Sequence, residues 1–243
     1  MKIGIIGMGM VGEAVAFGLN RIGHGVFGYD IDLSKSKAHW SEVLQTELTF
    51  VCVPTPLSLN GACNTDIVWR VVTQLNTSGY EGLIVIKSTV PPGTTNALGE
   101  TFSEMKLAFC PEFLRERARF SDFYENHEIC IAGVCRYSFG LNSYHADLIK
   151  EAHGNIPKYF KVMSTTEAEL AKYFVNCFNA YRINFANAFF DVCQAAGADY
   201  KTIKDAVTQR HDTRSSYLEA NEQFRAFGAC VEAGGWQHRG DAD

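Results

Sequence analysis

The chain has 243 residues, of which 47% are hydrophobic and 20% are charged, so it can bury a large core and is too apolar to be disordered. Its formal net charge of −5 excludes the basic surface that nucleic acids and anionic membranes attract, and we expect neither as a partner. No segment approaches the roughly 18 consecutive apolar residues of a membrane span, and glycine appears too early for a signal peptide. These features predict a cytoplasmic protein.

Short apolar segments rich in β-branched residues recur along the first two thirds of the chain. The expected strands cover residues 2–7, 25–30, 49–53, 83–87, 106–110, 128–132 and 159–162. Helical patterns lie between several of them, at about 11–22, 65–76 and 94–104. Strands that alternate with helices predict an α/β fold, with a Rossmann-like, doubly wound and mostly parallel sheet.

A different pattern begins near residue 166. From Thr166 to Ala196 the chain contains no Gly or Pro, and its apolar residues follow helical spacing after a capping sequence at 164–167, which predicts one long helix. We therefore expect a nucleotide-binding domain at 1–165, part of a helical central domain at 166–230, and a disordered tail at 231–243.

The segment Gly-Met-Gly-Met-Val-Gly at 7–12 follows the first expected strand and begins the first helix. Such glycines allow a tight turn, a close approach to a pyrophosphate and close helix packing, while the helix N-terminus favours the anion. Asp30 ends the second strand and can accept hydrogen bonds from a ribose, whereas a 2′-phosphate would be repelled. The alternative is that the glycines serve packing alone. The pattern predicts an NAD site that includes Gly7, Gly9, Gly12 and Asp30.

Three later strands end in segments rich in Pro, Ser, Thr and Glu. These segments are Val-Pro-Thr-Pro at 53–56, Lys-Ser-Thr-Val-Pro-Pro-Gly-Thr at 87–94, and Pro-Glu-Phe-Leu-Arg-Glu at 111–116. Any one of them could be an ordinary turn. Since doubly wound sheets bind ligands at the carboxyl ends of their strands, three in succession predict a ligand site there.

Together these motifs resemble the UDP-glucose/GDP-mannose dehydrogenase family, whose members use NAD to oxidise the alcohol of a nucleotide sugar to a carboxylate. The resemblance continues in Ala-Glu-Leu-Ala-Lys-Tyr-Phe-Val-Asn at 168–176, which is similar to the start of the family's central helix. It extends to Tyr-Leu-Glu-Ala-Asn at 217–221 and Phe-Arg-Ala-Phe-Gly-Ala-Cys at 224–230, which resemble the approach to the family's catalytic cysteine.

The resemblance implies roles for individual residues. For the cofactor it adds Met10, Val11, Lys35, Pro54, Thr55, Thr89 and Glu116. For catalysis it implies Thr89, Glu112, Glu116, Lys172, Asn176 and Cys230. For a nucleotide-sugar substrate it implies Glu112, Phe113, Leu114, Arg115, Lys172, Asn176, Tyr217 and Asn221.

Within this set the resemblance assigns specific chemistry. Glu112 assists proton transfer, Lys172 and Asn176 hold the negative charge that develops on the substrate oxygen, and Cys230 is the nucleophile. The spacing of four places Lys172 and Asn176 on one helix face. Without the resemblance, Lys172 would be interpreted as a surface lysine and Asn176 as a packing amide.

The chain departs from the family pattern in two places. The connection between Asp30 and Thr49 is short, which predicts fewer peripheral helices. Where the family has Phe-Gly-Gly-x-Cys-Leu-Pro-Lys-Asp, this chain has Phe-Gly-Ala-Cys-Val-Glu-Ala at 227–233. Glu232 adds negative charge beside a thiol that needs a positive environment, and the shorter loop misplaces it.

These departures predict a shortened dehydrogenase that binds NAD but completes little oxidation, with the rest of the central domain and the C-terminal domain absent. One alternative is a non-catalytic NAD-binding module of the same lineage. Another is an NAD-dependent dehydrogenase of the hydroxyacid type.

The eight cysteines include no Cys-x-x-Cys pair, and no histidine stands at a spacing typical of zinc. We therefore expect no metal site. Cys52 and Cys130 lie inside apolar segments, where a cysteine usually behaves as a small hydrophobic residue.

The long helix carries six aromatic residues: Phe174, Phe178, Tyr181, Phe185, Phe189 and Phe190. This is a large apolar surface to leave in water. Because members of the family commonly pair through this region, the resemblance implies a homodimer through the helix at 166–196.

Overall fold

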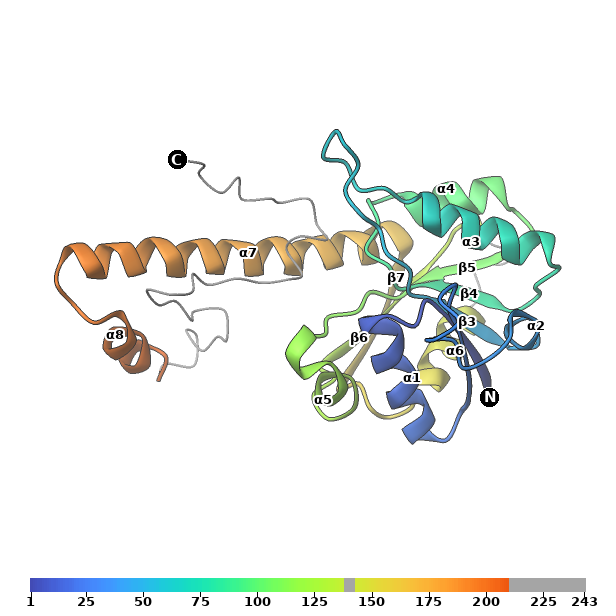
Figure 1. The fold of residues 1–243 in the computed structure, drawn as a ribbon. Helices are drawn as coiled ribbons and strands as arrows, with labels where there is room; N and C mark the ends of the chain where they lie inside the picture. Colours follow the sequence, from blue (N-terminus) through green and yellow to red (C-terminus); the bar gives the residue numbers. More distant parts are fainter. Residues whose placement is uncertain (138–142, 210–243) are drawn as a thin grey trace. The chain divides into compact units, whose positions relative to one another are not determined.

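The computed structural model describes residues 1–137 and 143–209. The chain divides into two compact units, Met1–Lys172 and Tyr173–Asp243. The first unit is built on a seven-stranded sheet with the order β2-β1-β3-β4-β5-β6-β7, and helices lie on both faces of this sheet (Figure 1). The predicted Rossmann-like α/β fold is therefore confirmed.

The strands are β1 (Lys2–Ile6), β2 (Gly25–Tyr29), β3 (Leu48–Val51), β4 (Leu83–Ile86), β5 (Lys106–Phe109), β6 (Ile129–Val134) and β7 (Tyr159–Ser164). The helices are α1 (Met10–Ile22), α2 (Trp40–Val43), α3 (Asp66–Thr77), α4 (Thr94–Thr101), α5 (Arg119–Tyr124), α6 (Ser143–His153), α7 (Thr165–Ala195) and α8 (Tyr200–Val207), with a 3-10 turn η1 at Glu116–Ala118. The sheet is parallel except where β5 meets β6.

Alternation along the strands sends side chains to two separate cores. On the first face, Ile3, Phe50 and Val85 pack with residues of α1, α5 and α6. On the second face, Val51 and Ile84 pack with residues of α2, α3, α4 and the first turns of α7. Because both faces of the sheet are covered by helices, a site can form at the ends of the strands, where the loops lie.

Four helices, α2, α5, α6 and α8, were not among those expected from the sequence. The short connection between β2 and β3 holds only the four residues of α2, which agrees with the predicted loss of peripheral structure. Between β5 and β6, α5 has six residues and spans about 9 Å. The strand that follows this helix, β6, runs antiparallel to β5.

The predicted long helix is also confirmed. Ser164 and Glu167 cap it, because the Glu167 carboxylate accepts the Ser164 N–H at 2.8 Å and the Ser164 hydroxyl accepts the Glu167 N–H at 3.3 Å. In the second unit, Ile183, Ala186, Phe190 and Cys193 of α7 form a small core with Tyr200 of α8. None of the helices in the described part of the chain combines the length and the apolar character needed to cross a membrane.

Candidate active site

The glycine loop connects β1 directly to α1. Gly7 has a φ of +94°, a conformation that other residues rarely adopt, and its N–H donates to the Tyr29 carbonyl at 2.9 Å. A Cβ on Gly12 would lie 1.9 Å from the Gly7 carbonyl oxygen, so α1 packs against the loop with no room for a side chain. A Cβ on Gly9 would meet nothing within 4 Å. The backbone at Gly9 is therefore uncovered at the start of a helix, where the first N–H groups lack helical acceptors.

Asp30 lies just beyond β2, beside this loop. One carboxylate oxygen accepts the Met8 N–H at 2.6 Å, and the other accepts the Asp32 N–H at 2.9 Å. A carboxylate has about four acceptor positions, so two remain for a ligand. An uncovered glycine backbone at a helix start, together with a partly buried carboxylate, fits the pyrophosphate and ribose of a dinucleotide.

Three further cofactor candidates lie in α1 and in the segment after β2. Met10 and Val11 lie in the first turn of α1 and are partly exposed. Lys35 lies in the segment after β2, where its exposed ammonium is 3.6 Å from the Asp32 carboxylate.

The loops after β3 and β4 are joined by hydrogen bonds. The Thr55 hydroxyl donates to the Thr89 carbonyl at 2.8 Å, and the Ser88 hydroxyl donates to the Val53 carbonyl at 2.7 Å. Pro54, between these contacts, has no backbone N–H to offer. The structure thus brings the predicted residues Pro54, Thr55 and Thr89 together at the carboxyl edge.

A buried ion pair lies at the same edge, on the first face of the sheet. Lys87 follows β4 and Glu112 follows β5, and the Lys87 ammonium donates to the Glu112 carboxylate at 3.0 Å. Their side chains are 1% and 5% exposed. The second Glu112 oxygen accepts the Phe113 N–H at 3.1 Å, so both oxygens have partners.

Burial and charge act in opposite directions on this pair. Burial by itself would raise the pKa of Glu112, but the Lys87 ammonium and the nearby His127 reverse this effect and lower the pKa. For Lys87 the directions are reversed: burial by itself would lower the pKa of the ammonium, but negative charge on Cys110 and Glu112 raises it. The carboxylate is held ionised, which is the state that can accept a proton.

Lys172, the last residue of the first unit, also reaches Glu112. Its ammonium donates to the Glu112 carbonyl oxygen and lies 5.4 Å from the centre of the Phe113 ring. The side chain is buried rather than exposed at the surface. One turn earlier on α7, Glu169 accepts the Gly93 N–H at 2.6 Å and the Thr95 N–H at 2.9 Å. This contact ties the start of α7 to α4 and so positions Lys172.

Other predicted substrate residues are placed differently. The Leu114 side chain packs in the core of the first face. The Arg115 guanidinium makes a bidentate ion pair with Asp122, at 2.9 and 2.6 Å. Glu116 is the first residue of η1.

Of the remaining predicted residues, Asn176 lies one helical turn after Lys172 on α7, in the second unit, and is buried. Tyr217, Asn221 and Cys230 lie outside the described residues.

Lys87 begins the motif at 87–94, but the motif by itself predicted no role for it. A signal was present, because Lys87 directly follows the four apolar residues of β4. An ammonium at the end of a buried strand needs a negative partner, and Glu112 after the neighbouring strand supplies one.

Comparisons with known proteins agree with this geometry. The profile of the UDP-glucose/GDP-mannose dehydrogenase family NAD binding domain matches residues 33–139, and that of the family's central domain matches residues 166–233. GDP-mannose 6-dehydrogenase of Pseudomonas aeruginosa is 26% identical over 95% of this chain and 62% of its own length. UDP-glucose 6-dehydrogenase of Haloferax volcanii is 27% identical over 90% of this chain and 61% of its own length.

A solved structure is also similar. A UDP-glucose dehydrogenase from the archaeon Pyrobaculum islandicum has a TM-score of 0.72 and 27% identity, over 85% of this chain and 56% of that one. The chain spans about three fifths of the length of the curated relatives it matches. The matched profile names NAD, and the glycine loop and Asp30 fit it, so NAD is the cofactor.

Proposed function

We propose, from the premise that this chain belongs to the UDP-glucose/GDP-mannose dehydrogenase family, that it oxidises the primary alcohol of a nucleotide sugar. The observation that carries this proposal is the buried group of Lys87, Glu112 and Lys172 at the carboxyl edge of the sheet, the edge that also carries the NAD loop. When bound, the nicotinamide ring supplies the hydride acceptor.

The protein residues divide the remaining work. Glu112, which Lys87 holds ionised, accepts the proton of the substrate alcohol, and Thr89 on the adjoining loop assists this transfer. The Lys172 ammonium stabilises the negative charge that develops on the substrate oxygen, and its bond to the Glu112 carbonyl keeps these two groups together. Asn176, one turn along α7, is proposed to help Lys172, and Phe113 to contact the substrate.

A sugar-nucleotide panel tests this function. We expect NADH formation with at least one of UDP-glucose, GDP-mannose and a UDP-N-acetyl sugar. Glu112→Gln is expected to lower the rate by about 100-fold or more, because a positioned base is lost, while calorimetric NAD affinity is unchanged. The matched control is Glu128→Gln, which changes an exposed carboxylate and should leave the rate unaltered. Equal rates in the Glu112→Gln and Glu128→Gln variants would contradict the assignment of the base.

Oxidation of the alcohol to the carboxylate takes two steps, and we propose that the second step is slow in this chain. It depends on Cys230, and the sequence around this residue has one glycine fewer than the family pattern and Glu232 in place of a basic environment. We expect about one NADH per sugar rather than two, as judged by comparing NADH yield with consumed sugar. A yield of two that is abolished by Cys230→Ser would contradict this.

The same departures favour a second candidate, a non-catalytic NAD-binding module. This candidate is supported if NAD binds but no sugar nucleotide in the panel yields NADH. The panel and the NAD titration, run together, therefore separate the two functions.

The cofactor preference has its own test. Because the Asp30 carboxylate would lie beside the 2′-position of the adenosine ribose, we expect NADP to bind more weakly than NAD. Asp30→Ala should narrow this gap. Equal affinity for both cofactors in the unaltered chain would contradict the role of Asp30.

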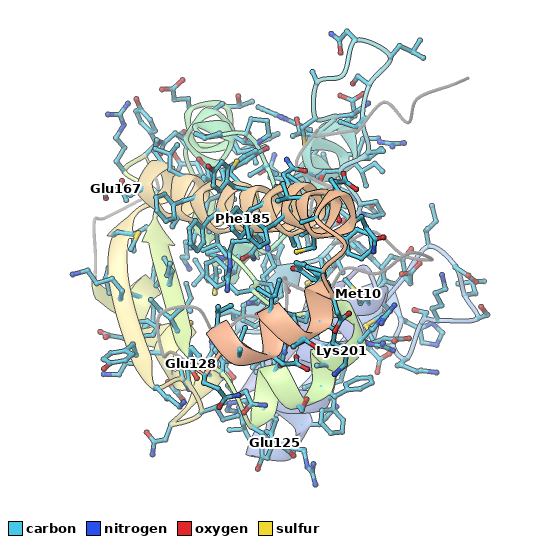
Figure 2. All side chains as sticks on the ribbon, turned by 90° about the vertical axis from the view of Figure 1, so that its left-hand side faces the viewer. Met10, Glu125, Glu128, Glu167, Phe185 and Lys201 are labelled. Atoms are coloured by element: carbon cyan, nitrogen blue, oxygen red, sulfur yellow. The ribbon has the colours of Figure 1, made fainter. Side chains whose placement is uncertain are left out.

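We also propose a homodimer through α7, in a cytoplasmic protein. Large apolar residues recur along this helix at steps of three and four, and Figure 2 shows their side chains with Phe185 labelled. The exposed ones are Leu170, Phe174, Phe178, Tyr181, Phe185, Phe189 and Val192. Phe178→Asp is expected to give a monomer in sedimentation, whereas Tyr144→Asp, which changes an exposed aromatic residue on α6, is not. A wild-type monomer at micromolar concentration would contradict the dimer.

A further inference from the structure

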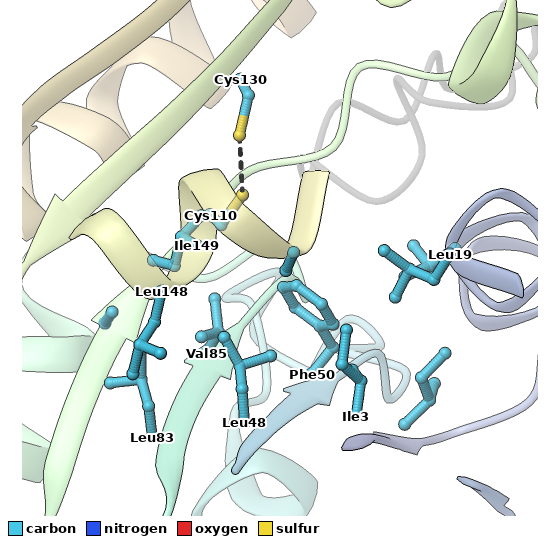
Figure 3. Close-up of a cluster of buried hydrophobic side chains, with 14 of the residues drawn as sticks. Ile3, Leu19, Leu48, Phe50, Leu83, Val85, Cys110, Cys130, Leu148 and Ile149 are labelled. Atoms are coloured by element: carbon cyan, nitrogen blue, oxygen red, sulfur yellow. Dashed lines mark hydrogen bonds between the residues drawn. The ribbon is translucent and has the colours of Figure 1, made fainter. Parts of the chain in front are cut away.

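Two cysteines and a histidine meet inside the first core. Cys110 directly follows β5, Cys130 lies on β6, and His153 ends α6. Each residue is only 1% exposed. One ligand atom from each, the two sulfurs and a ring nitrogen, all lie within 4.8 Å of one another. Figure 3 shows the two sulfurs facing each other among apolar side chains.

The sulfur geometry matches that of a bound metal ion. The Cys110 and Cys130 sulfurs are 3.8 Å apart. Two sulfurs bound at about 2.3 Å to one tetrahedral zinc ion lie roughly 3.8 Å apart, whereas a disulfide needs about 2.05 Å. The pair can therefore hold an ion between its sulfurs without moving.

The histidine is oriented as metal-bound histidines are. Its Nδ1 contacts the Ile149 carbonyl oxygen at 2.8 Å, and because a carbonyl only accepts, Nδ1 carries the proton. The unprotonated Nε2 is buried and has no hydrogen-bond partner. Metal-bound histidines usually donate their other N–H to such a carbonyl, which fixes the ring and its tautomer.

Charge in the cluster also suits a cation. The Lys87 ammonium lies 3.5 Å from the Cys110 sulfur. A divalent ion with two thiolates is neutral, so the occupied cluster adds no net charge to the core.

We propose that Cys110, Cys130 and His153 form a binding site for a thiophilic divalent cation, with Zn²⁺ as the ion that this set of ligands fits. Two sulfurs and one imidazole are ligands that zinc prefers over magnesium or calcium. Three ligands leave the fourth position for a further donor. The site joins β5, β6 and α6, so the ion would link the antiparallel end of the sheet to its covering helix.

Metal content tests the site independently of NAD and of catalysis. Protein purified in reducing buffer and incubated with Zn²⁺, then desalted, is expected to retain about one zinc per chain by elemental mass spectrometry. Cys110→Ser and His153→Gln should each lose most of this zinc. The matched control is Cys135→Ser, which removes an equally buried thiol on the second face and should retain the zinc.

Cobalt provides a second readout that needs no variant to fold. Co²⁺ added to the metal-free wild type should produce sulfur-to-cobalt charge-transfer absorption, and Zn²⁺ should displace it. Chelation should lower Tm, and zinc should restore it, because an ion that binds only the folded state stabilises it. A folded wild-type chain that retains no zinc and gives no cobalt absorption overturns the site. Zinc content that is unchanged in both ligand variants overturns the choice of ligands.

Discussion

The two faces of the sheet bury polar groups in different ways. On the second face, Thr46, Thr49 and Tyr80 form a network of neutral hydroxyls in which the Thr49 and Tyr80 oxygens lie 2.9 Å apart and Thr46 donates to the Val43 carbonyl at 2.7 Å. On the first face the buried polar groups include an ion pair, with Lys87 between Glu112 and Cys110.

The difference separates a structural role from a chemical one. A neutral hydroxyl that is satisfied within the protein costs little to bury, whereas a buried charge costs several kcal/mol unless it is paired. Hydrophobic residues of similar size would pack the first face at no such cost. The charged group lies at the carboxyl ends of the strands, the edge that also carries the NAD loop, which is the position expected of residues that act on a ligand.

The largest effect is expected from Lys87→Met, which leaves the Glu112 carboxylate buried without its cation. Breaking such a pair destabilises a protein by about 3–5 kcal/mol, measured as the free energy of unfolding in urea. Lys106→Met is the matched control, because this lysine on the neighbouring strand β5 is exposed. The double variant Lys87→Met with Glu112→Gln should recover part of the loss, since no unpaired carboxylate remains. No difference between the two single lysine variants would show that the pair is unimportant for folding.

Glu169→Ala should have the next largest effect. The second face has this one deeply buried carboxylate among its described residues, and it accepts from Gly93 N–H, Thr95 N–H and the Thr95 hydroxyl. Loss of the acceptor leaves buried donors at the start of α4, at a cost of about 2–3 kcal/mol. Urea denaturation measures this loss, and Glu151→Ala, which removes an exposed carboxylate on α6, is the control. If Glu169→Ala loses less stability than the control variant, the Glu169 carboxylate does not stabilise the start of α4.

Tyr80→Phe tests the neutral network and should cost only about 1 kcal/mol, because it removes one hydroxyl whose partners still bond to each other. The expected ratio of this loss to that of Lys87→Met expresses the contrast between the two faces. A loss as large as that of Lys87→Met would mean that the hydroxyl network is as sensitive as the ion pair.

The smallest effect is a pH dependence that comes from Glu169. Burial raises the pKa of its carboxyl group, and the hydrogen bonds from Thr95 and Gly93 only partly offset this. The folded state therefore holds this proton more tightly than the unfolded state, so stability falls as pH rises from about 4.3 through the raised folded-state pKa. In Glu169→Gln this component should be absent from the curve of unfolding free energy against pH. An identical curve for Glu169→Gln and wild type would contradict the raised pKa.

Much of the site could be predicted from local sequence. The glycine loop, Asp30 and the segments containing Thr55, Thr89 and Glu112 each follow a strand, and all of them lie at one edge once the strands are parallel. The position of Lys172 on the long helix followed from the family resemblance rather than from its spacing. Its burial against Glu112 could not be predicted, because that contact joins residues 60 positions apart.

The sequence by itself determined the alternating strands and helices, the dinucleotide loop and the long helix α7, because these depend on periodicity and on residues near one another along the chain. Only the tertiary structure decided the antiparallel direction of β6, the pairing of Lys87 with Glu112, and the meeting of Cys110, Cys130 and His153. The two cysteines are 20 positions apart, and no spacing rule for zinc covers them. They meet because β5 and β6 lie side by side and α6 packs over them, an arrangement set by strand order and packing rather than by any local pattern.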